Sequence, residues 1–406
     1  MTRRWELDAL RGLMLVLMTI THLPTRLSSA LGQPFGYVSA AEGFVLLSAY
    51  MAGLVYGGMA RKRGIEAMRP AFLRRARKVY ACHAATLLFL FTVIAAVGVR
   101  TDQPAVKDLM SYYLTHPLPA LVSGLLLMYQ PPLLDILPMY VLFLLASPWV
   151  LIHGLRRGWK VSMGVSAGLW LLAQFGLDRW VYEATVSLTG LAVPFHDTGA
   201  FLTFSWQFLW MLGLWMGASH ASPAHQPFAF PRWAVVLAVA LAGVGFVWRH
   251  AVGQSPFGPN EALNLLFDKW RLAPLRLLNL FALLILAIRF GPALVVRLPR
   301  LRVLETLGAA SLPVFCMQLV MVLLMLAFFG GNPLVHPVWL DALMVAVSFS
   351  VLYAVALFSA WLDRRMRPAT QATAAPPAPA AQDAPAPVPP SDPPQSPTAT
   401  VDNPLH

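Results

Sequence analysis

Charged side chains are scarce in this chain of 406 residues. Asp, Glu, Lys and Arg together make up 12% of the sequence, whereas apolar side chains make up 58%. About a quarter of the residues in an ordinary soluble domain are charged. The composition therefore excludes that class and indicates a polytopic membrane protein.

Cysteine and the common catalytic loops are scarce as well. The two cysteines, Cys82 and Cys316, fall within apolar runs and lack a paired or metal-like spacing, which favours packing over a disulfide or zinc site. The sequence has no Walker-type loop, metal-binding cluster, G-x-S-x-G elbow or dinucleotide fingerprint. These absences argue against an ATP-driven pump and a serine hydrolase, and no metal site is predicted. The internal symmetry of many transporters is not evident either.

Long apolar runs are abundant instead. A run of about twenty apolar residues can cross the hydrocarbon layer as a helix, and the chain offers about ten. We therefore predict an all-α membrane fold. The first run lacks a small-residue cleavage site, which predicts a retained helix and not a signal peptide. The expected spans cover approximately residues 8–27, 38–59, 79–99, 135–154, 160–177, 199–218, 232–250, 272–290, 309–329 and 338–361.

Lysine and arginine concentrate on one side of these spans. The positive-inside rule assigns that side, which includes the basic stretch 61–78, to the cytoplasm. With an even number of spans, both termini are expected in the cytoplasm. The net charge of +12 follows from this bias, so nucleic-acid binding is not needed to explain it.

The chain is expected to divide into a transmembrane domain, 1–363, and a disordered cytoplasmic tail, 364–406. The tail is rich in Pro and Ala and cannot bury enough apolar surface to fold. Segment 117–130 is apolar but short, so it is expected to be re-entrant or interfacial. The long external segments mix aromatic and amide side chains, a mixture that suits carbohydrate but also populates the membrane interface. These segments are 100–134, 178–198 and 251–271.

The first span carries polar residues at steps of three and four. Asp8, Arg11, Leu15, Thr19 and His22 fall on one helix face, with Arg11 and His22 roughly 16 Å apart along the axis. Ionisable groups at membrane depth cost at least a few kcal/mol each, so the pair predicts a functional site. A histidine is suited to move a proton to or from a hydroxyl. The alternative is a snorkelling arginine and a histidine hydrogen-bonded between helices.

Glu42 is the candidate partner of His22. It opens the second span and lies about as far from the outer surface as His22 does. A carboxylate there would hold the imidazole tautomer, like the third member of a catalytic triad. Pairing of Glu42 with Arg26 is an equal alternative.

A basic cluster lies between the second and third spans, in the expected loop and at the start of span three. Its members Arg74, Arg75 and Arg77 suit the phosphates of a nucleotide such as coenzyme A. A role as a topology determinant is an equal alternative.

Polar residues at membrane depth elsewhere are candidate substrate contacts. These candidates are Asp135, Arg276 and Asn279. Arg276 and Asp135 are expected near the same outer level, where they would pair or line a polar cavity.

Several motifs resemble a known family. The motif LDALRG at 7–12, with ten residues between Arg11 and His22, resembles acyltransferase family 3, a superfamily of membrane-bound acyltransferases. More narrowly, blocks along the chain up to about Asp363 resemble the OpgC family, which is linked to succinylation of osmoregulated periplasmic glucans. One departure is Ala49, where that family usually has glycine. The resembling blocks are 22–24, 40–50, 134–140, 275–279 and 307–315.

The resemblance implies an O-acyltransferase of the bacterial inner membrane. It would move an acyl group, expected to be succinyl, from cytoplasmic acyl-CoA to hydroxyls of a periplasmic glucan. His22 would act as general base or acyl carrier, and Arg11 would contact the donor behind an entry formed by Arg74, Arg75 and Arg77. Acyl-CoA is then a substrate, and no permanently bound cofactor is expected.

Two alternatives stay open at this point. One is an O-acetyltransferase that acts on another envelope polysaccharide, and the other is a glycan transporter or flippase without covalent chemistry. No feature of the sequence predicts the oligomeric state.

Overall fold

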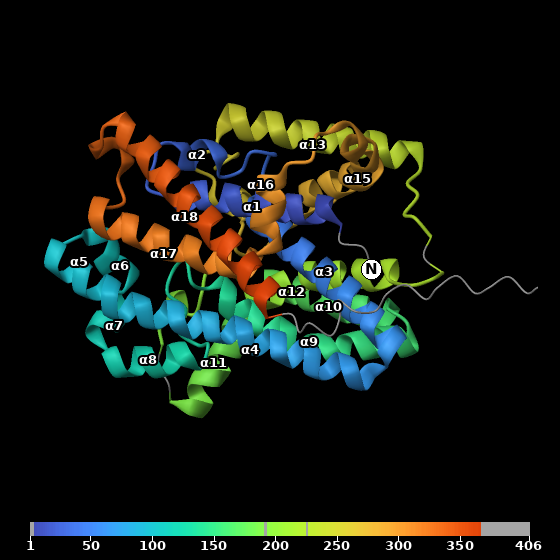
Figure 1. The fold of residues 1–406 in the computed structure, drawn as a ribbon, viewed down its shortest axis with the longest axis horizontal. Helices are drawn as coiled ribbons and strands as arrows, with labels where there is room; N and C mark the ends of the chain where they lie inside the picture. The colour runs from blue at the N-terminus through green and yellow to red at the C-terminus, as the bar shows by residue number, and fades with distance from the viewer. Residues whose placement is uncertain (1–3, 191–192, 225, 367–406) are drawn as a thin grey trace, which may run out of the picture. The chain divides into compact units, whose positions relative to one another are not determined.

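The computed structural model describes residues 4–190, 193–224 and 226–366, and within them the regular elements are helices without a strand. The chain divides into two units, Met1–Ala360 and Trp361–His406. The expected tail, 364–406, lies outside the described residues except for its first three. Figure 1 shows the helices of the first unit.

The α-helices are α1 Trp5–His22, α2 Leu27–Leu31, α3 Ala40–Arg63, α4 Ile65–Phe89, α5 Ala95–Thr101, α6 Pro104–Leu109, α7 Ser111–Thr115, α8 Pro117–Leu125, α9 Ile136–Arg157, α10 Lys160–Gln174, α11 Leu177–Thr189, α12 Thr203–His220, α13 Arg232–Val252, α14 Glu261–Asn264, α15 Pro274–Arg297, α16 Arg302–Ala309, α17 Ser311–Phe329 and α18 Val338–Arg365. A π-helical turn, η1 Leu90–Ile94, joins α4 to α5. The single 3-10 turns are η2 Phe195–Asp197, η3 Leu265–Phe267 and η4 Pro333–Val335.

Seven helical segments in the described part of the chain are long and apolar enough to cross a membrane. The expected count of about ten is therefore not confirmed. The expected spans 8–27, 160–177 and 199–218 do form helices, α1, α10 and α12. However, α10 has only 15 residues, and α1 carries Glu6, Asp8 and Arg11 within its 18 residues. The seven segments are Ala40–Arg63, Ile65–Thr101, Ile136–Arg157, Arg232–Val252, Pro274–Arg297, Ser311–Phe329 and Val338–Arg365.

The third span begins earlier than predicted. Gly64, at φ 82°, ends α3, and α4 starts at the next residue. α4 continues through Pro70 and is followed without a break by the π turn and α5, so the helical segment Ile65–Thr101 has 37 residues. The basic cluster at 74–77 therefore lies on a helix, and the expected loop position is wrong.

The apolar segment 117–130 does not span. It forms α8, a helix of 9 residues that starts with a proline at its first turn. The backbone between α8 and α9 is irregular, and within it Leu127 and Leu133 have positive φ angles. A short helix followed by irregular backbone fits the expected re-entrant or interfacial segment in length.

Glycine allows two helix pairs to approach through their backbones. A Cβ on Gly308 of α16 would lie 1.8 Å from the Asp8 carbonyl oxygen of α1, and one on Gly12 would lie 2.0 Å from the Leu304 carbonyl oxygen. On α12, a Cβ on Gly217 would lie 1.9 Å from the Tyr50 carbonyl oxygen of α3. Small residues at such crossings let membrane helices pack closely.

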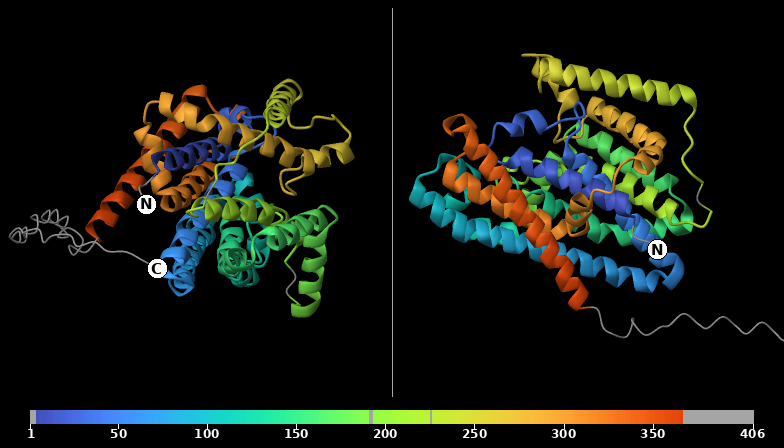
Figure 2. Two further views of the ribbon diagram at one scale, coloured as in Figure 1. Left: turned by 90° about the vertical axis from the view of Figure 1, so that its right-hand side faces the viewer. Right: turned by 45° about the horizontal axis from the view of Figure 1, so that its top comes forward.

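These crossings fix α1 within the bundle. It packs against α16, α3 and α17, while α3 packs against α12 and α4 lies along α9. Figure 2 shows α1 enclosed among these helices, with α13 and α15 side by side. The polar stripe of α1 therefore faces other helices.

The two cysteines lie on α4 and α17, which pack together. Cys82 and Cys316 are both free thiols, and their side chains are close enough to form a hydrogen bond. The sequence spacing did not indicate this proximity, because the two residues come from distant parts of the chain.

Candidate functional site

The predicted stripe on α1 forms as a helix face. Asp8 and Thr19 are buried, and Arg11 and His22 are half-buried. The Thr19 hydroxyl donates to the Leu15 carbonyl oxygen at 2.8 Å, so the helix itself satisfies it. The residues available for chemistry are therefore at the two ends of the stripe.

One end is the Arg11 cluster, formed by Asp8, Arg11 and Ser311. The Arg11 guanidinium donates to the Ser311 hydroxyl, and its Nη1 lies 3.9 Å from Asp8 Oδ1. Only 12% of the Arg11 side chain and 6% of the Asp8 side chain are exposed. The cluster is closed, with the α1–α16 crossing beside it.

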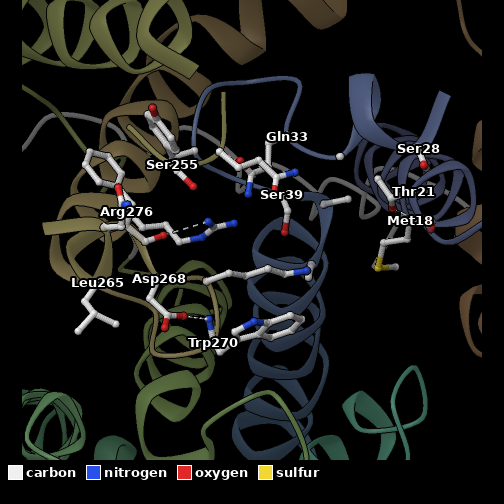
Figure 3. A pocket seen from close by; sticks show the side chains of 18 of the residues that line it. Met18, Thr21, Ser28, Gln33, Ser39, Ser255, Leu265, Asp268, Trp270 and Arg276 are labelled. Carbon is white, nitrogen blue, oxygen red and sulfur yellow. Dashed lines mark hydrogen bonds between the residues drawn. The ribbon is translucent and has the colours of Figure 1, made fainter. Parts of the chain in front are cut away.

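The other end opens into a cavity of about 750 Å³, which we call the His22 cavity. Its wall comes from the end of α1, the segment before α3, the segment 254–270 and the start of α15. Figure 3 shows Arg276, Ser39 and Trp270 around this space. The polar and aromatic residues of its wall include His22, Gln33, Ser39, Lys269, Trp270 and Arg276.

Gln318 of α17 is the polar neighbour of the His22 ring. Its side-chain nitrogen Nε2 lies 3.5 Å from His22 Nδ1, and Gln318 is fully buried. The amide oxygen and nitrogen of a glutamine are interchangeable by rotation, so the amide can either donate to Nδ1 or accept from it. In both arrangements Nδ1 faces Gln318.

Glu42 is fully buried in the first turn of α3. Its Oε2 accepts from the backbone N–H of Ser39 at 3.0 Å and from the Ser39 hydroxyl. The Ser39 side chain in turn accepts from the Glu42 backbone N–H, which completes a capping box. The other carboxylate oxygen of Glu42 accepts from Arg276 Nε. Breaking a buried ion pair of this kind costs about 3–5 kcal/mol, so Glu42 and Arg276 hold α3 and α15 together.

The prediction that Glu42 pairs with His22 or Arg26 is therefore wrong. Both carboxylate oxygens are engaged by Ser39 and Arg276, and the described residues include no contact from Glu42 to His22. The alternative with Arg26 fails too, because Arg26 Nη1 pairs with Asp341 Oδ2 at 2.9 Å.

Arg276 lines the cavity as one alternative predicted, and its side chain is 1% exposed. Asn279, one turn further on α15, is not among the cavity-lining residues. Its Oδ1 accepts from the Tyr37 backbone N–H at 3.0 Å, and Gly36 and Gly245 pack against it. Asn279 therefore positions the chain segment that carries Tyr37 on the cavity wall.

Asp135 is not paired with Arg276. Just before α9, it is 4% exposed and its Oδ2 accepts from the Ala200 backbone N–H at 3.1 Å. Burial raises the pKa of Asp135 to about 6, although the Ala200 N–H opposes the shift. In this structure the carboxylate anchors the segment before α12 and does not line the cavity.

Lys269 is a cavity residue that the sequence did not single out. Its Nζ lies 4.6 Å from the Trp270 ring centroid and 5.6 Å from that of Phe201. Burial lowers the pKa of Lys269, although the nearby Glu42 carboxylate raises it. Lysine beside tryptophan in an external segment is common at membrane interfaces, so the sequence offered no distinctive signal.

The basic cluster on α4 does not act as a unit. Arg74 and Arg77 are exposed, whereas Arg75 is half-buried. Arg75 and Arg11 both lie near Tyr140. Of the three expected donor contacts, Arg75 is thus the one that is partly covered by the helix bundle.

The fold and site define an all-helical, multi-span membrane protein. One of its helices, α1, carries a buried arginine cluster at one end and a histidine that lines a cavity at the other. Within the described residues, no group of three or more His, Cys, Asp or Glu side chains could hold a metal ion.

The family model described as OpgC protein matches residues 3–364. The chain therefore belongs to the OpgC protein family, and this membership implies a membrane acyltransferase of the OpgC type. Searches of curated proteins and of solved structures found no match.

Proposed function

We propose that the protein is an O-acyltransferase of the bacterial inner membrane that moves a succinyl group from cytoplasmic acyl-CoA to a hydroxyl of a periplasmic glucan. The observation that carries the proposal is the placement of Arg11 and His22. They lie on one face of α1, with Arg11 in a closed cluster and His22 open to a cavity. Membership in the OpgC family supports the acyl-transfer class.

His22 supplies the proton chemistry in this proposal. When Gln318 accepts a hydrogen bond from His22 Nδ1–H, the lone pair on Nε2 is free to take the proton of a sugar hydroxyl. The sugar oxygen then bonds to the thioester carbonyl carbon, the carbon–sulfur bond breaks, and the coenzyme thiolate leaves and takes up a proton. A second route, in which Nε2 itself accepts the acyl group before the sugar does, uses the same two residues.

The donor approaches from the Arg11 side. Arg75 is half-buried and suits a donor phosphate, while exposed Arg74 and Arg77 attract it from solvent. Arg11 is held by Asp8 and Ser311, so its guanidinium is oriented before the donor arrives.

The acceptor occupies the His22 cavity. Its volume of about 750 Å³ is in the range of small-ligand sites. The wall combines aromatic faces, such as Tyr37 and Trp270, with amide groups such as Gln33 and Asn264, a mixture suited to a sugar.

The test uses inside-out inner-membrane vesicles, in which the cytoplasmic face is outermost. With glucan in the lumen and labelled succinyl-CoA outside, the proposal predicts labelled glucan, and with both reagents outside it predicts none. Equal labelling in the two arrangements would contradict the two-sided path. If labelled glucan forms from acetyl-CoA but not from succinyl-CoA, the transferred group is acetyl and not succinyl. Movement of glucan across the membrane without acyl transfer would favour a transporter.

A further inference from the structure

We propose that Lys269, together with Arg276, forms a carboxylate-binding subsite in the wall of the His22 cavity. The subsite holds the free carboxylate of a dicarboxylic acyl group while its thioester end is beside His22. This inference rests on the proposed function and adds to it a structural basis for acyl selection.

Arg276 provides the first observation. Its side chain is 1% exposed and belongs to the cavity wall. Nε is used by Glu42, and Nη1 makes only a long contact of 3.4 Å with the Phe267 carbonyl oxygen. Nη2 is buried and has no hydrogen-bond partner among the described residues. A buried charged donor normally has an acceptor, so Nη2 is the nitrogen of Arg276 that is left to bind a ligand group.

Lys269 provides the second observation, from a different segment of the wall. Its ammonium lies over Trp270 and Phe201, and in the described part of the chain it has neither an ion pair nor a hydrogen bond. It is close enough to Arg276 and to His22 for the charges to interact. Two cationic donors and the histidine therefore share one cavity.

The acidic groups nearby are engaged elsewhere. Glu42 is bonded to Arg276, and Asp135 accepts from Ala200. On the wall itself, Asp268 accepts from the backbone N–H groups of Trp270 and Arg271, and Glu261 is exposed. The Lys269 charge is thus left without a bonded counter-ion among the described residues.

A carboxylate fits these two donors better than a neutral group does. Each of its oxygens can accept from one cation, and hydrogen bonds between charged partners are roughly twice as strong as neutral ones. A sugar hydroxyl would leave the Lys269 charge without a counter-ion. The carboxylate can come from the acyl group being transferred or from a glucan already acylated, and the experiment below separates these sources.

The experiment compares succinyl-CoA with acetyl-CoA as donors to unmodified glucan, in membranes that contain wild-type protein or Lys269→Met. Methionine keeps an unbranched apolar side chain but removes the charge. We expect the ratio of succinyl to acetyl transfer to fall about 10- to 100-fold, because the variant loses one charge-assisted hydrogen bond to the acyl carboxylate. Lys269→Arg should restore most of the ratio. Lys107→Met, at a half-exposed lysine paired with Asp102, is the matched control and should leave the ratio unchanged.

The outcomes separate the two proposals. If wild-type membranes transfer neither acyl group, the proposed function fails. If they transfer succinyl but Lys269→Met lowers the transfer from both donors equally, the acyl carboxylate does not bind at this subsite. If the variant instead fails only on glucan that already carries succinyl groups, the carboxylate belongs to the acceptor. Arg276→Lys, which keeps a charge beside Glu42, gives a second measurement of the ratio should Lys269→Met not accumulate.

Discussion

The two ends of the α1 stripe contain similar polar residues but differ in how these are satisfied. In the Arg11 cluster, Asp8 and Ser311 engage the guanidinium, and the backbones of α1 and α16 meet beside it. Around the His22 cavity, Lys269 and one nitrogen of Arg276 have no bonded partner among the described residues. The Arg11 end is therefore closed around its own partners, whereas the His22 end has space for a ligand.

The largest effect is expected at the closed end. Gly308→Ala places a Cβ 1.8 Å from the Asp8 carbonyl oxygen, so α1 and α16 must separate. We expect the free energy of unfolding to fall by about 3 kcal/mol, with loss of transfer activity as Arg11 shifts. Thermal melting of the purified protein in detergent measures the first effect.

Gly168→Ala on α10 is the matched control, because a Cβ there meets nothing within 4 Å. It should be neutral or stabilise the helix by up to about 1 kcal/mol. Equal melting temperatures for the two variants would contradict the close crossing of α1 and α16.

A smaller effect, with a defined sign, is expected near the open end. Burial raises the pKa of Asp135 in the folded protein to about 6, above the 3.8 of an exposed aspartate. The folded protein therefore holds this proton more tightly than the unfolded chain, and stability should decrease as pH rises from about 4 to about 6. The loss amounts to at most about 3 kcal/mol, and Asp135→Asn should remove it. Melting temperatures between pH 4 and pH 7 test this difference.

Asp102 is the control of opposite sign. A hydrogen bond from Lys107 lowers the pKa of this exposed carboxyl, so its contribution is lost as pH falls. If Asp135→Asn leaves the pH profile unchanged while Asp102→Asn alters it, Asp135 is not the buried proton-binding group described above.

Local patterns in the sequence predicted much of this structure. Helices form at all ten expected spans, and the steps of three and four on α1 correctly place Asp8, Arg11, Thr19 and His22 on one face. Such predictions succeed because apolar runs and helical periodicity are properties of neighbouring residues. The expected third span covered only the apolar run 79–99, so it missed the more polar first part of α4, which begins at Ile65.

The contacts within the site could not be predicted in the same way. Glu42 and Arg276 are 234 positions apart, and a single sequence contains no signal that pairs them in preference to His22 or Arg26. Lys269 resembles an ordinary interfacial lysine until the fold brings its segment over the cavity. The individual polar residues were therefore predictable, but their partners required the three-dimensional arrangement.

His22 acts on the acceptor hydroxyl in the proposed reaction, and mass spectrometry of periplasmic glucan measures the product of that step. Cells that carry His22→Ala are compared with wild type and with His250→Ala, which changes an exposed histidine near the end of α13. Loss of a general base lowers the rate about 10²- to 10⁴-fold. We therefore predict glucan with almost no succinyl groups from His22→Ala at a normal protein level, and normal glucan from His250→Ala. An unchanged succinyl content in His22→Ala would contradict the account.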